Sequence, residues 1–359
     1  MSSNSFFLSM IINISRGFEN RVPNNGISDD VYKRIVKSYQ LSKADQAIAA
    51  PHYQVGNEWI PIFEEHLKEF IKVMSSADMA QVKRIFTNFF REKVSAGLHG
   101  LHFKMVEKYM TEGRKSEEQD LKLYMDSIIS NLNIFIRNFP RTDISVLKRN
   151  NYGNPYGYHV GDLFLIAGAE YHYYCATKIK MLLNTLANCR IMELGGGFGG
   201  MAYYILRDYP ESRYLGFDLP EQAALQAYYL LSSFPEKRIC LYGEAELNED
   251  SINRYDALLM PNFMLECLAE DSVNLSFNSY SLAEMEVDAI SNYIKLICSA
   301  TSGFFYHLNH AVIARVSADL FPIDYDKFEL QFRYPAMWGK FDGRNPVLDE
   351  HEYIYKRIL

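Results

Sequence analysis

The run Ile191-Met192-Glu193-Leu194-Gly195-Gly196-Gly197-Phe198-Gly199-Gly200 decides the fold class of this chain. Residues 190–194 form a short apolar segment that stops at the glycines, and residues 201–207 behind them have a helical pattern. A glycine-rich turn between a strand and a helix lets backbone N–H groups approach a ligand, and it points the helix N-terminus at that ligand. The run therefore predicts a ligand-binding turn at the end of a buried strand.

Strand and helix patterns alternate after this turn. Short apolar segments typical of strands occupy residues 213–217, 238–242, 257–260, 273–277 and 304–308, with a closing pair at 328–333 and 353–358. Helical patterns occupy residues 221–234 and 281–298. Such alternation is typical of a parallel sheet with helices on both faces. We therefore expect an α/β, Rossmann-like fold for this part of the chain.

The first part of the chain has a different pattern. Apolar stripes with helical spacing occur at residues 31–39, 59–71, 82–90 and 121–136. Turn-forming residues at 150–158 then precede a renewed helical pattern at 163–186. The 359 residues exceed the roughly 250–300 at which a single core stops growing. We therefore expect a mostly helical N-terminal domain at residues 1–150, acting as a lid, acceptor site or oligomerisation surface, and an α/β domain at residues 151–359.

Composition narrows the classes of partner and compartment. The net charge of −7 argues against nucleic acid as the main partner, because a phosphate backbone selects basic surfaces. The five cysteines form no CxxC pair, so we expect no disulfide framework and a cytoplasmic location. The apolar run at residues 6–14 is too short to span a bilayer and follows no positive cluster, and no other stretch approaches about 18 apolar residues. We expect neither a signal peptide nor a membrane span.

The glycine spacing alone fits two kinds of cofactor. Gly195-x-Gly197-x-x-Gly200 matches the dinucleotide fingerprint, and Asp218 follows about 20 residues later, where an acidic residue binds a ribose. A nucleotide-dependent oxidoreductase using NAD(P) is therefore one alternative. Glu193, directly before the glycines, favours the other, because a carboxylate there would repel a pyrophosphate and attract a cationic ligand.

The same string resembles motif I of class I S-adenosylmethionine (SAM) methyltransferases, in which an acidic residue precedes GxGxG. The resemblance implies SAM as the cofactor, with the turn against its methionine part and Asp218 on the ribose hydroxyls, since a carboxylate can accept from both hydroxyls. The residues of this predicted site are Glu193, Gly195, Gly196, Gly197, Phe198, Gly199, Asp218 and Leu219.

Further strings resemble the sugar O-methyltransferases of bacterial polysaccharide and glycoconjugate pathways. They are Gly216-Phe217-Asp218-Leu219-Pro220-Glu221, Leu259-Met260-Pro261-Asn262-Phe263, Asn278-Ser279-Tyr280-Ser281-Leu282-Ala283-Glu284-Met285 and Phe305-Tyr306-His307-Leu308-Asn309. The resemblance covers residues 154–359. It implies that Pro261, Asn262 and Phe263 border the adenine, and that Asn278 and Ser279 lie beside the sulfonium and the acceptor.

One point of this assignment stays open in the sequence. The third strand of the sheet is either 238–242 or 257–260, which makes Glu244 a second candidate for the adenine side.

Methyl transfer to a hydroxyl benefits from a general base, because an alcohol is a weak nucleophile. The candidates are His307, Glu284, His172 and His310, and we favour His307 because it follows the fifth strand of the predicted sheet. Glu284 has an alternative role, since Ser281-x-x-Glu284 is a capping box. His172 has one too, because it lies in an aromatic run that would pack around a helix. No spacing among Asp256, Asp271, Glu284 and Asp288 marks a metal site, so we expect no metal.

The functional hypothesis is a SAM-dependent O-methyltransferase that acts on a sugar or sugar conjugate, in polysaccharide biosynthesis. The alternatives are a methyltransferase of another small molecule with a hydroxyl or an amine, the NAD(P)-dependent oxidoreductase, and a non-catalytic SAM-fold subunit. The basic and aromatic segment 83–93 either binds an anionic sugar or is the solvated face of an amphipathic helix. The number and aromatic content of the N-terminal helices suggest a homodimer.

Overall fold

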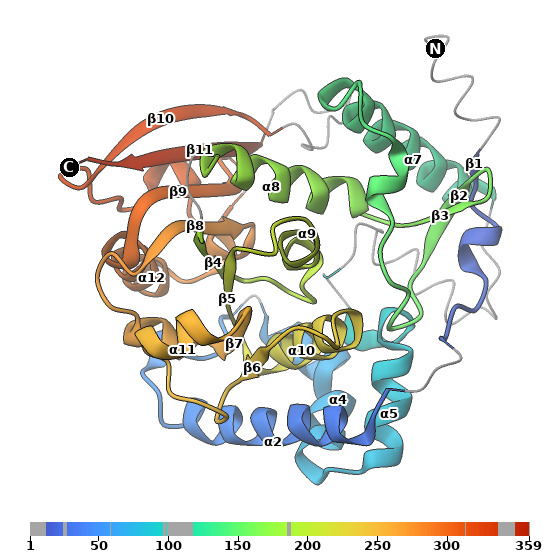
Figure 1. Cartoon of the computed structure of the whole chain (residues 1–359), viewed down its shortest axis with the longest axis horizontal. Helices are drawn as coiled ribbons and strands as arrows, with labels where there is room; N and C mark the ends of the chain where they lie inside the picture. The colour runs from blue at the N-terminus through green and yellow to red at the C-terminus, as the bar shows by residue number, and fades with distance from the viewer. Residues whose placement is uncertain are drawn as a thin grey trace.

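The computed structural model describes residues 12–23, 27–57, 59–95, 98, 118–184, 188–312, 314–336 and 349–358. Within them the centre of the molecule is an eight-stranded sheet of order β10-β11-β9-β8-β4-β5-β7-β6 (Figure 1). The strands are β4 (Arg190–Leu194), β5 (Arg213–Asp218), β6 (Ile239–Leu241), β7 (Ala257–Pro261), β8 (Val273–Ser279), β9 (Thr301–His310), β10 (Phe328–Pro335) and β11 (Glu350–Arg357).

The pairing of these strands confirms the predicted fold class. The strands from β9 to β6 are mutually parallel, whereas β11 pairs antiparallel with both β9 and β10. The sheet also settles which strand is third, because β7 pairs with β5 and β6 lies outside β7. Glu244, the alternative adenine candidate, forms an ion pair with Arg34 at that outer edge.

Helices cover both faces of the sheet. They are α8 (Ala169–Leu182), α9 (Gly200–Asp208), α10 (Pro220–Ser233), α11 (Glu249–Arg254) and α12 (Val287–Ala300). Alternate residues of β4 join different cores, since Ile191 packs with the cluster that contains α8, α9 and α10, and Met192 packs with the cluster that contains α12. This burial on both faces explains why the strand is apolar throughout.

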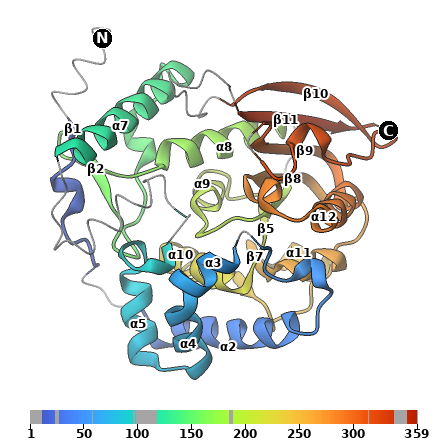
Figure 2. The same cartoon turned by 180° about the vertical axis from the view of Figure 1, so that it is seen from behind.

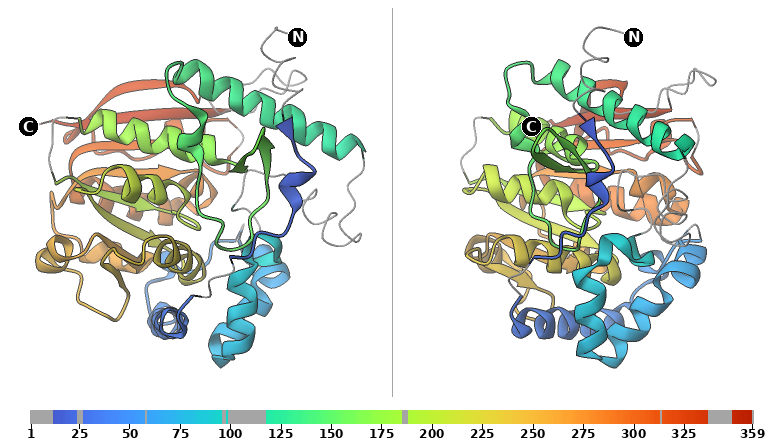
Figure 3. Two further views of the ribbon diagram at one scale, coloured as in Figure 1. Left: turned by 45° about the vertical axis from the view of Figure 1, so that its right-hand side comes forward. Right: turned by 90° about the vertical axis from the view of Figure 1, so that its right-hand side faces the viewer.

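The region before the sheet is mostly helical, as predicted. Its elements are β1 (Ile12–Asn13), η1 (Arg16–Phe18), α2 (Asp29–Gln46), η2 (Pro51–Tyr53), α3 (Ile60–Ile62), η3 (Phe63–Leu67), α4 (Lys68–Ser76), α5 (Met79–Thr87), η4 (Phe89–Arg91), η5 (Lys93–Ser95), α7 (Glu118–Asn138) and η6 (Ile144–Leu147). Ser28 caps α2 by accepting the N–H of Asp30. Tyr32, Ile35 and Tyr39 of α2 are buried in the core that also contains α10. Figure 3 shows the ribbon of α2, drawn in blue, at the lower edge of the molecule.

The expectation of a helix at residues 163–186 is wrong at its start. The hairpin β2 (Gly157–Val160) and β3 (Leu163–Ile166) pairs with β1, and α8 begins only at Ala169. Gly161-Asp162 forms the two-residue turn, with φ +58 at Gly161, and this dipeptide is a hairpin signal. The four apolar residues of β3 are too few for periodicity to separate strand from helix.

No helix in the described ranges is long and apolar enough to cross a membrane. All five cysteines are free thiols, and only Cys267 is exposed.

Candidate functional site

The glycine turn follows β4 as predicted, and it holds a conformation that favours glycine. Gly195 has φ +79, and its N–H donates to the carbonyl of Phe217 at 2.8 Å. A Cβ added at Gly195 would lie 2.2 Å from Oγ of Ser281. Both the left-handed backbone and this close approach therefore require glycine at this position.

A cavity of about 510 Å³ opens at the carboxyl ends of β4 and β5. One wall comes from these strand ends, one from the start of α12, and one from the segment between η2 and α3, which runs past them (Figure 2). The predicted site residues that line the cavity are Gly195, Asp218, Leu219, Asn262 and Glu284. Its other lining residues are Pro51, His52, Gln54, Val55, Gly56, Asn57, Trp59, Leu194, Gln222, Ser281, Met285, Glu286, Asp288, Ala289 and Tyr293.

Asp218 ends β5 at the cavity, and backbone groups fix its carboxylate. The N–H of Gly197 donates to Oδ2 at 2.8 Å, and the N–H of Leu219 donates to Oδ1 at 2.7 Å. Burial raises the pKa of Asp218 to about 7, although both N–H groups act to lower it. Each carboxylate oxygen has a second lone pair, so Asp218 can still accept bonds from a ligand.

Glu193 lies behind the glycine turn and does not line the cavity. It is buried, and its carboxyl accepts the hydroxyl proton of Tyr214, to which Gln226 also donates. Burial raises the pKa of Glu193 to about 8, so the side chain is largely protonated at pH 7. The role of Glu193 in attracting a cationic cofactor therefore stays a prediction, and its side chain is directed toward Tyr214 and not into the cavity.

The four remaining glycine-turn residues also lie outside the lining. Phe198 is buried edge-on against Phe90, whereas Gly196 and Gly199 pack against the side chain of Gln226. Gly197 contributes its N–H to Asp218 and thereby positions a lining residue.

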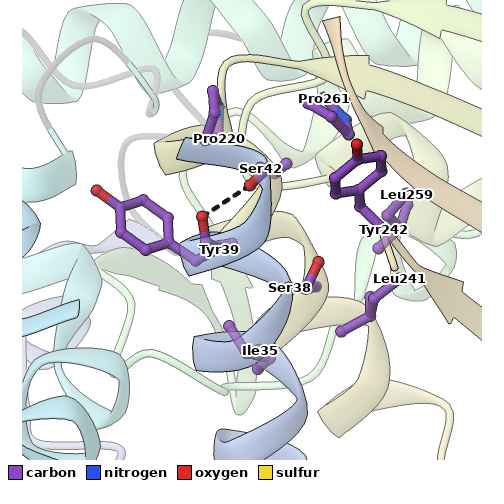
Figure 4. A pocket seen from close by; sticks show the side chains of 12 residues that line it. Ile35, Ser38, Tyr39, Ser42, Pro220, Leu241, Tyr242, Leu259 and Pro261 are labelled. Carbon is purple, nitrogen blue, oxygen red and sulfur yellow. Dashed lines mark hydrogen bonds between the residues drawn. The ribbon is translucent and has the colours of Figure 1, made fainter. Parts of the chain in front are cut away.

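Of the three predicted adenine-side residues, Asn262 and Pro261 line different hollows and Phe263 lines neither. Asn262 lines the large cavity, where its Nδ2 donates to the carbonyl of Tyr53 and to the hydroxyl of Tyr293, and its Oδ1 accepts the N–H of Phe263. Pro261 lines a hollow of about 10 Å³ between α2 and the strands β6 and β7, together with Ser38, Tyr242 and Leu259 (Figure 4). That hollow holds at most one water molecule.

Asn278 and Ser279, at the end of β8, and Phe263 complete the set of predicted cofactor-binding residues. Asn278 is fully buried, and its Nδ2 donates to the carbonyl of Leu194 at 2.9 Å and to Oγ of Ser281 at 2.6 Å. Ser279 hydrogen bonds with the hydroxyl of Tyr171, and Phe263 is buried against Tyr242. None of the three lines the cavity.

Glu284 is the only one of the four general-base candidates that lines the cavity. Its Oε2 accepts from Nε1 of Trp59 at 2.9 Å. The capping box proposed for it does not form, because Glu284 ends a separate 3₁₀ turn, η8 (Ser281–Glu284), and α12 begins at Val287. The predicted helix start at residue 281 is corrected accordingly.

The three histidine candidates lie elsewhere. His307 is fully buried in β9, stacks on Tyr353 at 4.5 Å between ring centroids, and has its pKa lowered by burial to about 3. His172 packs against Gly200, and burial lowers its pKa well below the ordinary value. His310 pairs with Asp349. The prediction that His307 is the general base therefore has no geometric support, because His307 lies within β9 and does not line the cavity.

Sequence reasoning missed the wall formed by Pro51, His52, residues 54–57 and Trp59. Its side chains precede the sheet by more than a hundred residues, and no spacing rule links them to the glycine turn. The sequence offered one signal for this wall, which is Trp59. The chain has only two tryptophans, and tryptophan is enriched at binding surfaces.

The charged clusters weighed as ligand sites have other partners. Within the basic and aromatic segment 83–93, Lys83 pairs with Asp29, Arg84 pairs with Glu69 and Glu92, and Arg91 is buried. Among the described residues, no three His, Cys, Asp or Glu side chains are arranged to hold a metal ion.

Comparisons with known proteins identify the class of domain. Residues 170–281 match the family model of an O-methyltransferase domain. No curated protein matches the chain. Magnesium protoporphyrin IX methyltransferase from Synechocystis with bound SAM has a TM-score of 0.37 and 12% identity, covering 53% of this chain and 81% of its own. A TehB-like SAM-dependent methyltransferase from Corynebacterium glutamicum has a TM-score of 0.35 and 13% identity, covering 52% and 88%.

The chain has a class I methyltransferase fold. Together with the family match, this fold indicates an enzyme that transfers methyl groups and uses SAM as its cofactor. The oxidoreductase that the glycine spacing left open is therefore set aside.

Proposed function

We propose that the enzyme transfers a methyl group to a hydroxyl of a sugar or sugar conjugate. The observation that carries the proposal is the composition of the cavity, which joins the glycine turn and Asp218 to a wall of one indole and several amide and carboxylate side chains. The finer choice of acceptor also draws on the resemblance of the strings around Asn278 and His307 to sugar O-methyltransferases.

The residues at the strand ends fit the cofactor. We assign the methionine part of SAM to the turn at Gly195, the ribose hydroxyls to Asp218, and the adenine to the side of Leu219 and Asn262. A cavity of about 510 Å³ is within the ordinary range for small-molecule sites. When bound, SAM supplies the electrophilic methyl group.

The opposite wall suits a polyhydroxylated acceptor. Trp59 offers an apolar aromatic face that can pack against the C–H groups of a sugar ring. The amide nitrogens of Gln54 and Asn57 donate to protein groups, so these residues offer amide oxygens, and Asp288 offers a carboxylate, that can accept from hydroxyls. A purely aromatic acceptor would not supply the donors that these oxygens can use.

We assign the role of general base to Glu284. Its carboxylate would take the proton of the acceptor hydroxyl as that oxygen becomes the nucleophile. The hydrogen bond from Trp59 fixes the orientation of the carboxylate, so that one indole both contacts the acceptor and positions the base.

The test is methyl transfer from labelled SAM to a panel of nucleotide sugars, oligosaccharides, phenols and amines. We expect label only in carbohydrate products, identified by mass spectrometry. Label in phenols or amines with none in any carbohydrate would overturn the sugar assignment. S-adenosylhomocysteine binding, measured separately, confirms in each preparation that the cofactor site is intact.

A further inference from the structure

Gln222 has an unusual position in the cavity wall. It belongs to the first turn of α10, four residues after Asp218, and only 3% of its surface is exposed. Its side chain lines the cavity, yet neither Nε2 nor Oε1 forms a hydrogen bond within the described chain. A buried amide without partners costs stability, so such a group calls for a ligand.

The neighbouring amide of Asn262 shows the difference between a structural and a ligand-binding role. Asn262 lines the same cavity and is equally buried, but its Nδ2 and Oδ1 are all engaged with protein groups. Gln226, one helical turn after Gln222, is buried too, and its Nε2 donates to the hydroxyl of Tyr214 at 3.0 Å. Of these three amides, only Gln222 has neither its donor nor its acceptor engaged by a protein group within the described chain.

We propose that the Gln222 amide binds the adenine base of SAM, with Oε1 accepting from the exocyclic N6 amino group and Nε2 donating to N7. A glutamine amide matches this edge of adenine in a bidentate way. Asp218 ends β5 and Gln222 lies in the first turn of α10, which begins at Pro220, so both residues line the same cavity within four positions of the chain. The base is attached to the ribose that we assign to Asp218. The inference rests on the SAM cofactor and not on the choice of acceptor.

The test compares binding of three ligands by calorimetry: S-adenosylhomocysteine, its inosine analogue, in which oxygen replaces the N6 amino group, and its 7-deaza analogue. The unmodified enzyme should bind each analogue about tenfold more weakly than S-adenosylhomocysteine, because each removes one bond of the pair. In Gln222→Met, S-adenosylhomocysteine should bind about 100-fold more weakly because both bonds of the pair are lost, and the preference over both analogues should disappear.

Gln226→Met is the matched control, with the same substitution in the same helix outside the cavity. It should lower the melting temperature, because it removes the partner of Tyr214, and keep the ligand preference. Gln222→Met should melt no lower than the unmodified protein without ligand, since it removes an unsatisfied buried amide. The proposal is overturned if Gln222→Met keeps the preference, or if the unmodified enzyme does not distinguish the analogues. Weaker binding with an unchanged preference would place Gln222 on the ribose instead.

Because no acceptor is involved, these measurements stand apart from the sugar proposal. Failure to methylate carbohydrates would leave the Gln222 result intact, and loss of the adenine preference would say nothing about the acceptor.

Discussion

The carboxyl edge of the sheet has two halves that carry similar chemistry and differ in access. At β4 and β5 the strand ends meet the cavity, where Gly195 and Asp218 face a ligand-sized space. At β9 and β11, His307 and Glu352 are fully buried among aromatic rings. Both halves present acids or bases, so residue type alone does not identify a reactive group. Access to the cavity is what separates them.

The closed half is held by hydrogen bonds to the carboxylate of Glu352. Glu352 accepts hydroxyl protons from Tyr174, Tyr306 and Tyr334 at 2.8–3.2 Å. On the other face of the same strands, His307 stacks against Tyr353. A network of this kind rigidifies a core, and it explains part of the high tyrosine content of the chain.

The strongest test of this comparison exchanges one carboxylate in each half. Glu284→Gln should lower kcat by about 10²- to 10³-fold, because a general base contributes on that scale, with little change in S-adenosylhomocysteine affinity. Glu352→Gln should lower the melting temperature and retain kcat in the folded fraction, because its amide puts a donor where tyrosine hydroxyls donate. The measurement is kcat of both variants and of the unmodified enzyme with saturating SAM. A normal kcat for Glu284→Gln would remove it from the reaction.

The second test removes the charge that meets the ribose. Asp218→Asn should weaken S-adenosylhomocysteine binding about 100-fold, since two hydrogen bonds to a charged group are lost at about 1.5 kcal/mol each. Asp208→Asn, at the far end of α9 beside Arg207, is the matched control and should leave calorimetric affinity unchanged. Equal affinities for both variants would contradict the assignment of Asp218.

The sequence was sufficient for the open half where the evidence was local. The glycine turn, the acid at the end of β5 and the alternation of strands follow from local spacing. The sheet and the place of Asp218 at the end of β5 agree with the prediction, whereas its role in binding the ribose stays a prediction. It was not sufficient for Glu193, whose direction depends on Tyr214 in the next strand, or for His307, whose surroundings come from β11. The wall at residues 51–59 depends on a tertiary contact that no local pattern encodes.

A smaller effect is expected from pH, and it sharpens the role of Asp218. Its folded-state pKa of about 7 lies above the ordinary 3.8, so ionisation near neutrality disfavours the ligand-free fold and prepares the site for ribose hydroxyls. Stability without ligand should therefore fall as pH rises toward 7. Affinity for 5′-methylthioadenosine, which lacks the titratable amino group of SAM, should rise roughly tenfold from pH 6 to pH 8. In Asp218→Asn, calorimetry should give the same affinity for 5′-methylthioadenosine at pH 6 and at pH 8. An equal rise of affinity with pH in this variant would indicate that Glu193 is the titrating group.

The smallest functional effect is expected at His307, in the closed half. His307→Phe keeps the stacking on Tyr353 and removes Nε2, which has no partner within the described chain, so S-adenosylhomocysteine affinity and kcat should be unchanged. The folded-state pKa of about 3 lies below the ordinary 6.5, so His307 favours the fold above pH 6.5 and this contribution is lost as pH falls toward 3. Urea unfolding at pH 7 and pH 4 should show a loss of stability that is smaller in His307→Phe, by roughly 3 kcal/mol. If the variant instead binds S-adenosylhomocysteine normally and no longer transfers methyl groups, the closed half takes part in the chemistry and burial is no guide to access.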